Sequence, residues 1–157
     1  MQIKLIAIGK TDQMELEHLI SIYQNRLSHY VRFSFEIIPD LKNSKNFSEK
    51  LQKEEEGKLI LSKITATDRL ILLDENGKEM NSVIFSEFLQ KQMNSGIKRL
   101  VMVIGGPYGF SEAIYKKATG KLALSKMTFS HQMVRLFVIE QLYRGFTILK
   151  NEPYHHR

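Results

Sequence analysis

The segment from Leu100 to Phe110, with the sequence LVMVIGGPYGF, decides the fold class of this chain. Five apolar residues follow one another without polar alternation and lead into three glycines, Gly105, Gly106 and Gly109. Unbroken apolar strands are typical of parallel sheets, which are covered on both faces. Open α/β sheets bind ligands at the carboxyl ends of such strands, and glycines let a ligand approach the backbone. The segment predicts a buried strand ending in a ligand-binding loop, with a plain strand-to-helix turn as the alternative.

Strands and helices alternate along the rest of the chain. Apolar runs predict further strands at 2–8, 32–38, 69–74 and 121–125, with a turn at 75–78. Helical spacing and polar caps predict helices at about 13–28, 48–63, 82–93, 111–118 and 131–149, capped in three cases by Ser48, Ser82 and Ser111. This alternation predicts an α/β fold in one domain spanning residues 1–157, with helices on both faces of a parallel sheet.

Three segments carry further expectations. The glutamates 54–56 are expected to be solvated on their helix. The polar segment 39–47, which carries Lys42 and Lys45, is either a solvated loop or a surface that faces RNA. The helix at 131–149 is apolar around most of its circumference, and a domain this small buries such a helix most easily at a subunit interface. A homodimer is therefore expected.

Composition narrows the possible functions. The 157 residues include 23 Lys and Arg against 17 Asp and Glu, so the net charge of +6 favours an anionic partner such as nucleic acid. The absence of cysteine excludes disulfides, thiolate catalysis and zinc–thiolate sites. No stretch is long and apolar enough to suggest a secretory signal or a membrane span, so we expect no membrane association and a cytoplasmic location.

The sequence does not match familiar catalytic and nucleotide-binding motifs. Gly9-Lys10-Thr11 resembles the end of a phosphate-binding loop, but Lys4 stands where that motif requires its first glycine. The glycine loop lacks the spacing of a dinucleotide fold, and neither a nucleophile elbow nor an H-E-x-x-H helix occurs. His155 and His156 are adjacent and so point in different directions, and we expect no metal site.

A set of short blocks carries the interpretation further. These blocks are IGGP (104–107), LSKMTF (124–129), HQMVR (131–135), EQLYR (140–144) and PYH (153–155). In this order and spacing the chain resembles, over its whole length, the RlmH family of SPOUT-class methyltransferases, which modify a pseudouridine in the large ribosomal RNA. Two positions depart from the family: Ser130, where proline is usual, and Tyr108 within the glycine loop.

The resemblance implies a parallel-sheet SPOUT (α/β-knot) fold with a carboxyl-terminal trefoil knot. It implies S-adenosyl-L-methionine as cofactor, a homodimer, and large-subunit rRNA within the assembled ribosome as substrate. The methyl group would go to N3 of the pseudouridine. The cofactor contacts carried over are Leu73, Gly105, Gly106, Leu124, Ser125, Lys126, Met127, Thr128 and Phe129.

By the same resemblance, three residues near the carboxyl terminus would meet the target base. Tyr154 would orient or stack on it, His155 is a possible proton acceptor, and Arg144 would supply positive charge. A ribosome- or RNA-binding factor without catalysis remains the alternative, which cofactor binding would exclude. A nicotinamide-dependent oxidoreductase is disfavoured, because Glu112 follows the glycine loop too soon to bind a ribose.

Overall fold

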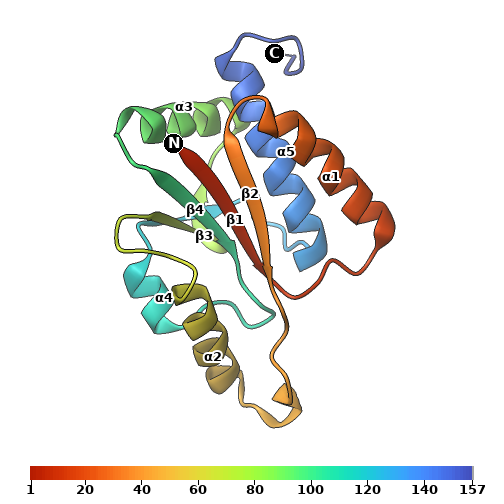
Figure 1. Ribbon diagram of the computed structural model, residues 1–157, viewed down its shortest axis with the longest axis vertical. Coiled ribbons are helices and arrows are strands. Elements are labelled where there is room, and N and C mark those ends of the chain that lie inside the picture. The colour runs from red at the N-terminus through yellow and green to blue at the C-terminus, as the bar shows by residue number, and fades with distance from the viewer. Residues whose placement is uncertain (157) are drawn as a thin grey trace.

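The computed structural model describes residues 1–156 and forms an α/β fold (Figure 1). Its elements are β1 (Gln2–Ile8), α1 (Met14–Ser28), β2 (Arg32–Ile38), the 3-10 turn η1 (Ser44–Asn46), α2 (Glu49–Leu61), β3 (Arg69–Glu79), α3 (Ser82–Asn94), β4 (Arg99–Ile104), α4 (Glu112–Lys117), β5 (Gly120–Ala123) and α5 (His131–Leu149). The five strands make one sheet in the order β2-β1-β4-β3-β5, and every adjacent pair is parallel. The predicted parallel α/β fold is confirmed.

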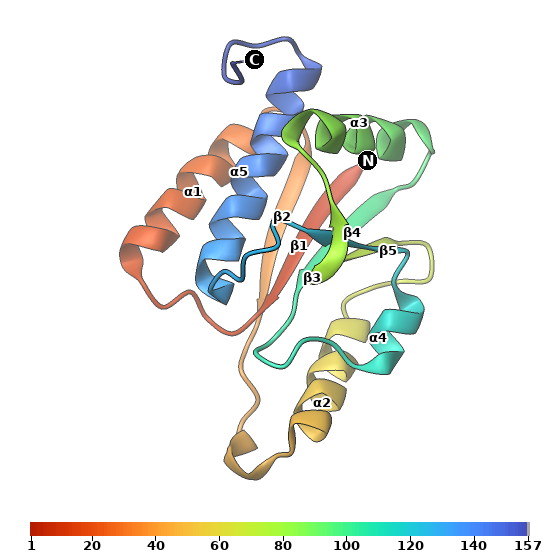
Figure 2. The ribbon, with the colours of Figure 1, turned by 180° about the vertical axis from the view of Figure 1, so that it is seen from behind.

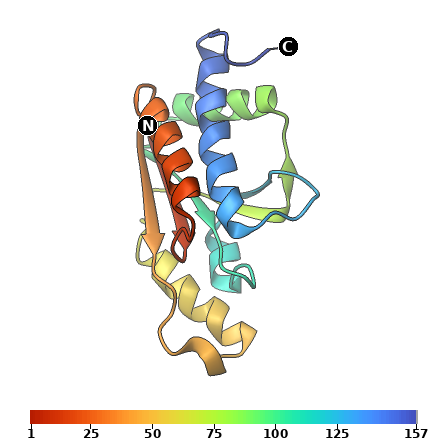
Figure 3. The same cartoon turned by 90° about the vertical axis from the view of Figure 1, so that its right-hand side faces the viewer.

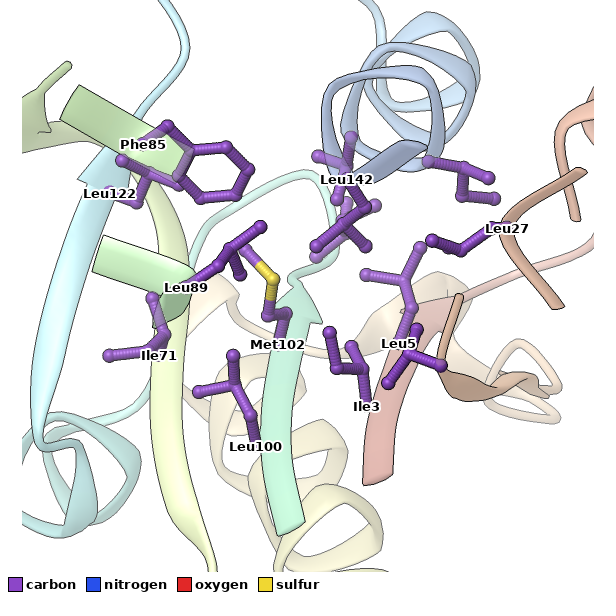
Figure 4. Packing of buried hydrophobic residues seen from close by; sticks show 14 of the residues in the cluster. Ile3, Leu5, Leu27, Ile71, Phe85, Leu89, Leu100, Met102, Leu122 and Leu142 are labelled. Atoms are coloured by element: carbon purple, nitrogen blue, oxygen red, sulfur yellow. The ribbon is translucent and has the colours of Figure 1, made fainter. Parts of the chain in front are cut away.

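Helices cover both faces of the sheet, which explains why β4 shows no polar alternation. Leu100, Met102 and Ile104 face a core built with α1, α3 and α5. Figure 4 shows Met102 of β4 between Leu89 of α3 and Leu142 of α5. Val101 and Val103 face the opposite core, which is built with α2 and α4. Figure 2 shows these two layers from behind.

The turn predicted at 75–78 is wrong, because β3 continues through it to Glu79. Leu73 and Lys78 both pair with Leu122 of β5, so the residues between them bulge out of the ladder. Gly77 makes this close return possible: a Cβ there would lie 2.6 Å from the backbone of Leu122. The predicted strand at 121–125 also shifts, since β5 ends at Ala123 and residues 124–130 form a loop.

The helix caps follow the prediction in part. The Ser48 hydroxyl accepts a hydrogen bond from the Leu51 N–H at 3.1 Å, which confirms the cap of α2. Asn81 and not Ser82 caps α3, because its side-chain oxygen accepts from the Ile84 N–H at 2.9 Å. Ser111 stands at the cap position of α4 but its side chain makes no capping hydrogen bond.

The helix α5 lies between α1 and α3 on one face of the sheet (Figure 3). Most of its apolar circumference is therefore buried within the same chain. The exception is its first half, where Met133 is 39% exposed and Phe137 is half-buried. The trefoil knot expected near the carboxyl terminus stays a prediction.

Candidate active site

A cleft of about 450 Å³ opens at the carboxyl end of β4, beside the bulge of β3 and the end of β5. Its wall combines the bulge of β3, the glycine loop, the loop after β5 and the first turn of α5. The lining residues are Leu73–Asn76, Ile104–Phe110, Tyr115, Leu122, Leu124, Ser125, Met127, Thr128, Phe129, His131 and Val134. This is the edge at which open α/β sheets bind ligands, and the volume suits a small organic molecule.

The cleft collects eight of the nine residues predicted to contact the cofactor. Lys126 is the exception: it is exposed and does not line the cleft, although its neighbours on both sides do. The loop that carries it turns at Ser125, whose hydroxyl accepts a hydrogen bond from the Met127 N–H at 3.0 Å. The loop therefore presents apolar side chains and backbone to the cleft while Lys126 faces solvent.

The glycine loop is shaped by what lies behind it. A Cβ on Gly105 would lie 3.1 Å from the ring of Phe110, and a Cβ on Gly106 would lie 2.3 Å from the Glu56 carboxylate. Gly109 closes the turn with φ of 79°, and its N–H donates to the Gly106 carbonyl at 3.1 Å. Gly105 and Gly106 can thus offer the cleft only backbone groups, as the sequence predicted for a ligand loop.

Glu56 is a carboxyl group that the sequence wrongly placed in solvent. It is 4% exposed, because the turn of α2 that carries it packs directly under Gly106. Gln52 donates a hydrogen bond to its Oε1 at 3.0 Å. Burial raises the pKa of Glu56 above its ordinary value, although the hydrogen bond from Gln52 opposes the shift. Charge pattern alone does not identify this residue, because Glu56 is one of three consecutive glutamates that together suggest a solvated helix face.

Arg135 fixes the start of α5 against β1. Its side chain is fully buried and donates to the Thr11 hydroxyl at 3.0 Å and to the Ile8 carbonyl at 2.8 Å. One turn earlier, His131 lines the cleft, and burial followed by the charge of Arg135 lowers its pKa. At neutral pH His131 is therefore uncharged, and the first turn of α5 is a fixed wall of the cleft.

Ser130, one of the two departures from the family pattern, is the N-cap of α5. Its hydroxyl accepts a hydrogen bond from the Met133 N–H at 3.3 Å. Its φ of −62° is also one that proline adopts. Serine therefore keeps the backbone conformation that proline would impose and adds a capping hydrogen bond.

The three residues predicted to act on the base lie together at the far end of α5. Arg144 donates to Oε1 of Glu140 at 2.6 Å through Nη2, and Tyr154 donates to the same oxygen at 3.0 Å. The guanidinium of Arg144 lies 4.6 Å from the centre of the Tyr154 ring, and its Nη1 lies 3.5 Å from Nδ1 of His155. The tail is thus folded onto the helix as one cluster.

Glu140 organises this cluster, although it is not among the site residues predicted from the sequence. Burial by itself would lower the pKa of Arg144, but the hydrogen bond and charge of Glu140 raise it above its ordinary value. Burial, a hydrogen bond with Tyr23 and the charge of Glu140 together raise the pKa of Tyr154. The spacing of four residues between Glu140 and Arg144 was the available signal, because it places both on one helix face.

The cleft and the tail cluster do not meet within one chain. His131 lies at the first turn of α5 and Arg144 near its last, about 20 Å apart at the rise of an α-helix. Figure 3 shows the tail at the end of α5 away from the loop that precedes it. The cleft and the tail cluster are therefore two separate regions of the chain.

Residues 1–156 hold neither a cluster of metal-binding side chains nor a membrane-spanning helix. No group of three or more histidine, aspartate or glutamate side chains there could hold a metal ion. No helix among these residues combines the length and apolar character needed to cross a membrane.

Comparison with known proteins assigns the family. A solved structure of a probable methylase family protein from Haemophilus influenzae Rd KW20 matches 99% of this chain and 70% of its own, with a TM-score of 0.52 and 11% identity. At that identity the match shows a shared fold. The family model described as predicted SPOUT methyltransferase matches residues 1–155. The chain is therefore a SPOUT methyltransferase.

Curated relatives narrow the family further. Two proteins named ribosomal RNA large subunit methyltransferase H, from Flavobacterium johnsoniae and Flavobacterium psychrophilum, are 73% and 72% identical over 157 residues, with full coverage of both chains. A third with that name, from Parabacteroides distasonis, is 60% identical over 156 residues and covers 99% of each chain. The chain belongs to the SPOUT methyltransferases and, within them, to the RlmH family.

Proposed function

We propose that this enzyme uses S-adenosyl-L-methionine to methylate N3 of a pseudouridine in large-subunit rRNA, within the assembled ribosome in the cytoplasm. The relatives that share its full length are named as large-subunit rRNA methyltransferases. The net charge of +6 suits a polyanionic substrate. The observation that carries the proposal is the pairing of a cofactor-sized cleft with a separate polar cluster, one for each of the two reactants.

The cleft fits the methyl donor. Leu73, Leu124 and Phe129 offer apolar surface to an adenine ring, and the glycine loop offers backbone groups. When bound, S-adenosyl-L-methionine supplies a methyl group on a positively charged sulfur: the N3–C bond forms as the C–S bond breaks, and the sulfur leaves as a neutral thioether. The chain itself must hold the donor, exclude water and prepare N3.

The tail cluster supplies what N3 requires. An imide nitrogen is a poor nucleophile until its proton leaves, so the site needs a proton acceptor and a positive charge. His155 and Glu140 are the two acceptors in the cluster, and Arg144 is the cation between them. Tyr154 presents a ring on which a base can stack. These four residues are proposed to bind the nucleotide and to stabilise its anion.

The cleft and the tail cluster are proposed to be two half-sites of one active site, and their separation supports a homodimer. About 20 Å of helix divides them within one chain, whereas methyl transfer needs the reacting atoms in contact. A second subunit can bring its tail to the first subunit's cleft, and two-fold symmetry then makes two equal sites. The exposed apolar side chains of Met127, Phe129 and Met133 lie beside the cleft, where such a subunit would dock.

Subunit complementation tests the cofactor site, the tail and the dimer together. Leu124→Trp should fill the cleft and abolish cofactor binding in calorimetry, while Arg144→Ala should leave cofactor binding intact and abolish methylation of ribosomes. Each variant alone should be inactive. Mixed after unfolding and refolding, they should recover roughly a quarter of wild-type activity, because half of the dimers are mixed and hold one intact site of two.

The controls separate the parts of the proposal. Two Arg144→Ala preparations mixed in the same way should stay inactive. Recovery would fail if each cleft worked with its own tail. Failure of the wild-type protein to bind S-adenosyl-L-methionine would overturn the cofactor assignment. A methyl group found at a different position, by mass spectrometry of the nucleosides, would overturn the proposed target atom.

A further inference from the structure

The charged residues of the cleft are unlike those of the chain as a whole. Among the residues that line it in the described part of the chain, Asp74 and Glu75 are acidic and none is Lys or Arg. His131 is neutral there, because burial and Arg135 lower its pKa. The lining residues therefore have a formal charge of −2, whereas the whole chain has a formal net charge of +6. The acidic character of the cleft must therefore be explained by the chemistry of the ligand that it binds.

Asp74 is held in place by two donors. The Tyr115 hydroxyl donates to its Oδ2 at 2.7 Å, and the Asn76 N–H donates to its Oδ1 at 2.8 Å. Burial and the hydrogen bond to Asp74 raise the pKa of Tyr115 to about 12, so the phenol keeps its proton and continues to donate. The two hydrogen bonds thus hold the Asp74 carboxyl group at the point where β3 bulges out of the sheet.

Glu75 reaches the opposite wall. The Thr128 hydroxyl, on the loop after β5, donates to its Oε2 at 3.4 Å. Lys78 and Glu79 follow on the same strand but are exposed and lie outside the cleft. The two carboxylates that face the cleft therefore come from the bulge between Leu73 and Lys78. The turn predicted here from the sequence would not place them in the wall of a cleft.

We propose that Asp74 and Glu75 make the cleft selective for the positively charged methyl donor over its demethylated product, S-adenosylhomocysteine. The inference rests on the proposed function. The donor carries a sulfonium charge that the product lacks, and the two molecules otherwise share the same groups. Carboxylates in a partly desolvated cleft attract a cation more strongly than they would in water, and the half-buried Asp74 should contribute more than the exposed Glu75. The product, which loses this attraction once the methyl group has left, exchanges for fresh donor.

Calorimetry with three probes tests this on wild-type protein. S-adenosylmethionine and sinefungin each carry the additional positive charge, and S-adenosylhomocysteine does not. Both cations should bind more tightly than the neutral thioether, and their advantage should shrink as salt is raised, because salt screens the partly exposed pair of carboxylates. An equal affinity for all three, unmoved by salt, would overturn the proposal without any variant being made.

Variants locate the effect. In Asp74→Asn/Glu75→Gln the ratio of the two dissociation constants, product over donor, should fall about tenfold, which corresponds to about 1.4 kcal/mol. The fall should come from weaker donor binding with little change for the product. The control is Glu79→Gln, which removes one negative charge of the same kind from the exposed end of β3. It should leave the ratio unchanged.

Two other outcomes have distinct meanings. Equal weakening of donor and product would show that the carboxylates bind groups that the two molecules share, such as the ribose hydroxyls, and would overturn the selectivity. Failure of wild-type protein to bind any of the three probes would overturn the proposed function and this inference with it.

Discussion

At the scale of single residues, Glu56 links the pH of the solution to the stability of the glycine loop. Its pKa in the folded chain is raised above 4.5, its ordinary value, so the folded state is favoured while the carboxyl is protonated. This contribution is complete below the ordinary value and is lost as the pH rises through the raised one. At neutral pH the ionised Glu56 therefore destabilises the fold.

Glu56→Gln should consequently raise the urea midpoint at pH 7, and the gain should disappear as the pH falls below 4.5. The amide keeps the oxygen that accepts from Gln52 and carries no charge to desolvate. Glu54→Gln, an exposed neighbour on the same helix, is the control and should show no such pH-dependent gain. A Glu56→Gln protein that is less stable than wild type at pH 7 would refute this account.

Gly106 and Glu56 should also prove to be coupled. Gly106→Ala places a methyl group 2.3 Å from the Glu56 carboxylate, so the loop must shift, at a cost of about 1–3 kcal/mol. In a Gly106→Ala/Glu56→Ala protein the added methyl has room, and the two free-energy changes should not add. Strict additivity in denaturant unfolding would mean that the glycine is required for another reason.

At the scale of elements, Ser130 begins α5 with a capping hydrogen bond, at a position where proline would instead restrict the backbone. Ser130→Ala removes the hydrogen bond to the Met133 N–H and should cost about 1 kcal/mol. Ser130→Pro loses the same bond but restricts the unfolded chain, which returns about 0.4–1 kcal/mol. The proline variant should therefore be more stable than the alanine variant in urea unfolding. The reverse order would show that the backbone at Ser130 does not tolerate proline despite its φ of −62°.

At the scale of the whole molecule, the exposed apolar start of α5 should govern assembly. Met133→Glu places a charge where we propose the second subunit docks, and the protein should sediment as a monomer at micromolar concentration. Leu51→Glu is the matched control, because Leu51 is 38% exposed on α2, which covers the opposite face of the sheet from α5. If Met133→Glu remains a dimer, the interface lies elsewhere.

The monomer made by Met133→Glu also separates binding from catalysis. It should still bind the cofactor, since the cleft belongs to one chain, and should lose methylation, since the tail of a second chain is proposed to complete the site. Full activity in a protein that sediments as a monomer would place both half-sites in one subunit.

The sequence by itself determined the sheet and the place of the cleft. The unbroken apolar run at 100–104 required cover on both faces, and the structure provides it with two separate cores. The glycine loop followed from the same segment, because only residues without side chains leave backbone groups open at the end of a buried strand. Local pattern was sufficient here because burial and backbone freedom are properties of short segments.

Only the tertiary structure decided which polar residues share a site. Glu56 lies under Gly106 because α2 packs against the loop, and Asp74 and Glu75 face the cleft because β3 bulges where the sequence predicted a turn. Glu140 gathers Arg144 and Tyr154 because the tail folds back on α5. Each pairing brings together different segments of the chain, and the local pattern of one segment does not predict its contact with the other. The energy of a buried or paired charge depends on neighbours that only the folded chain brings near.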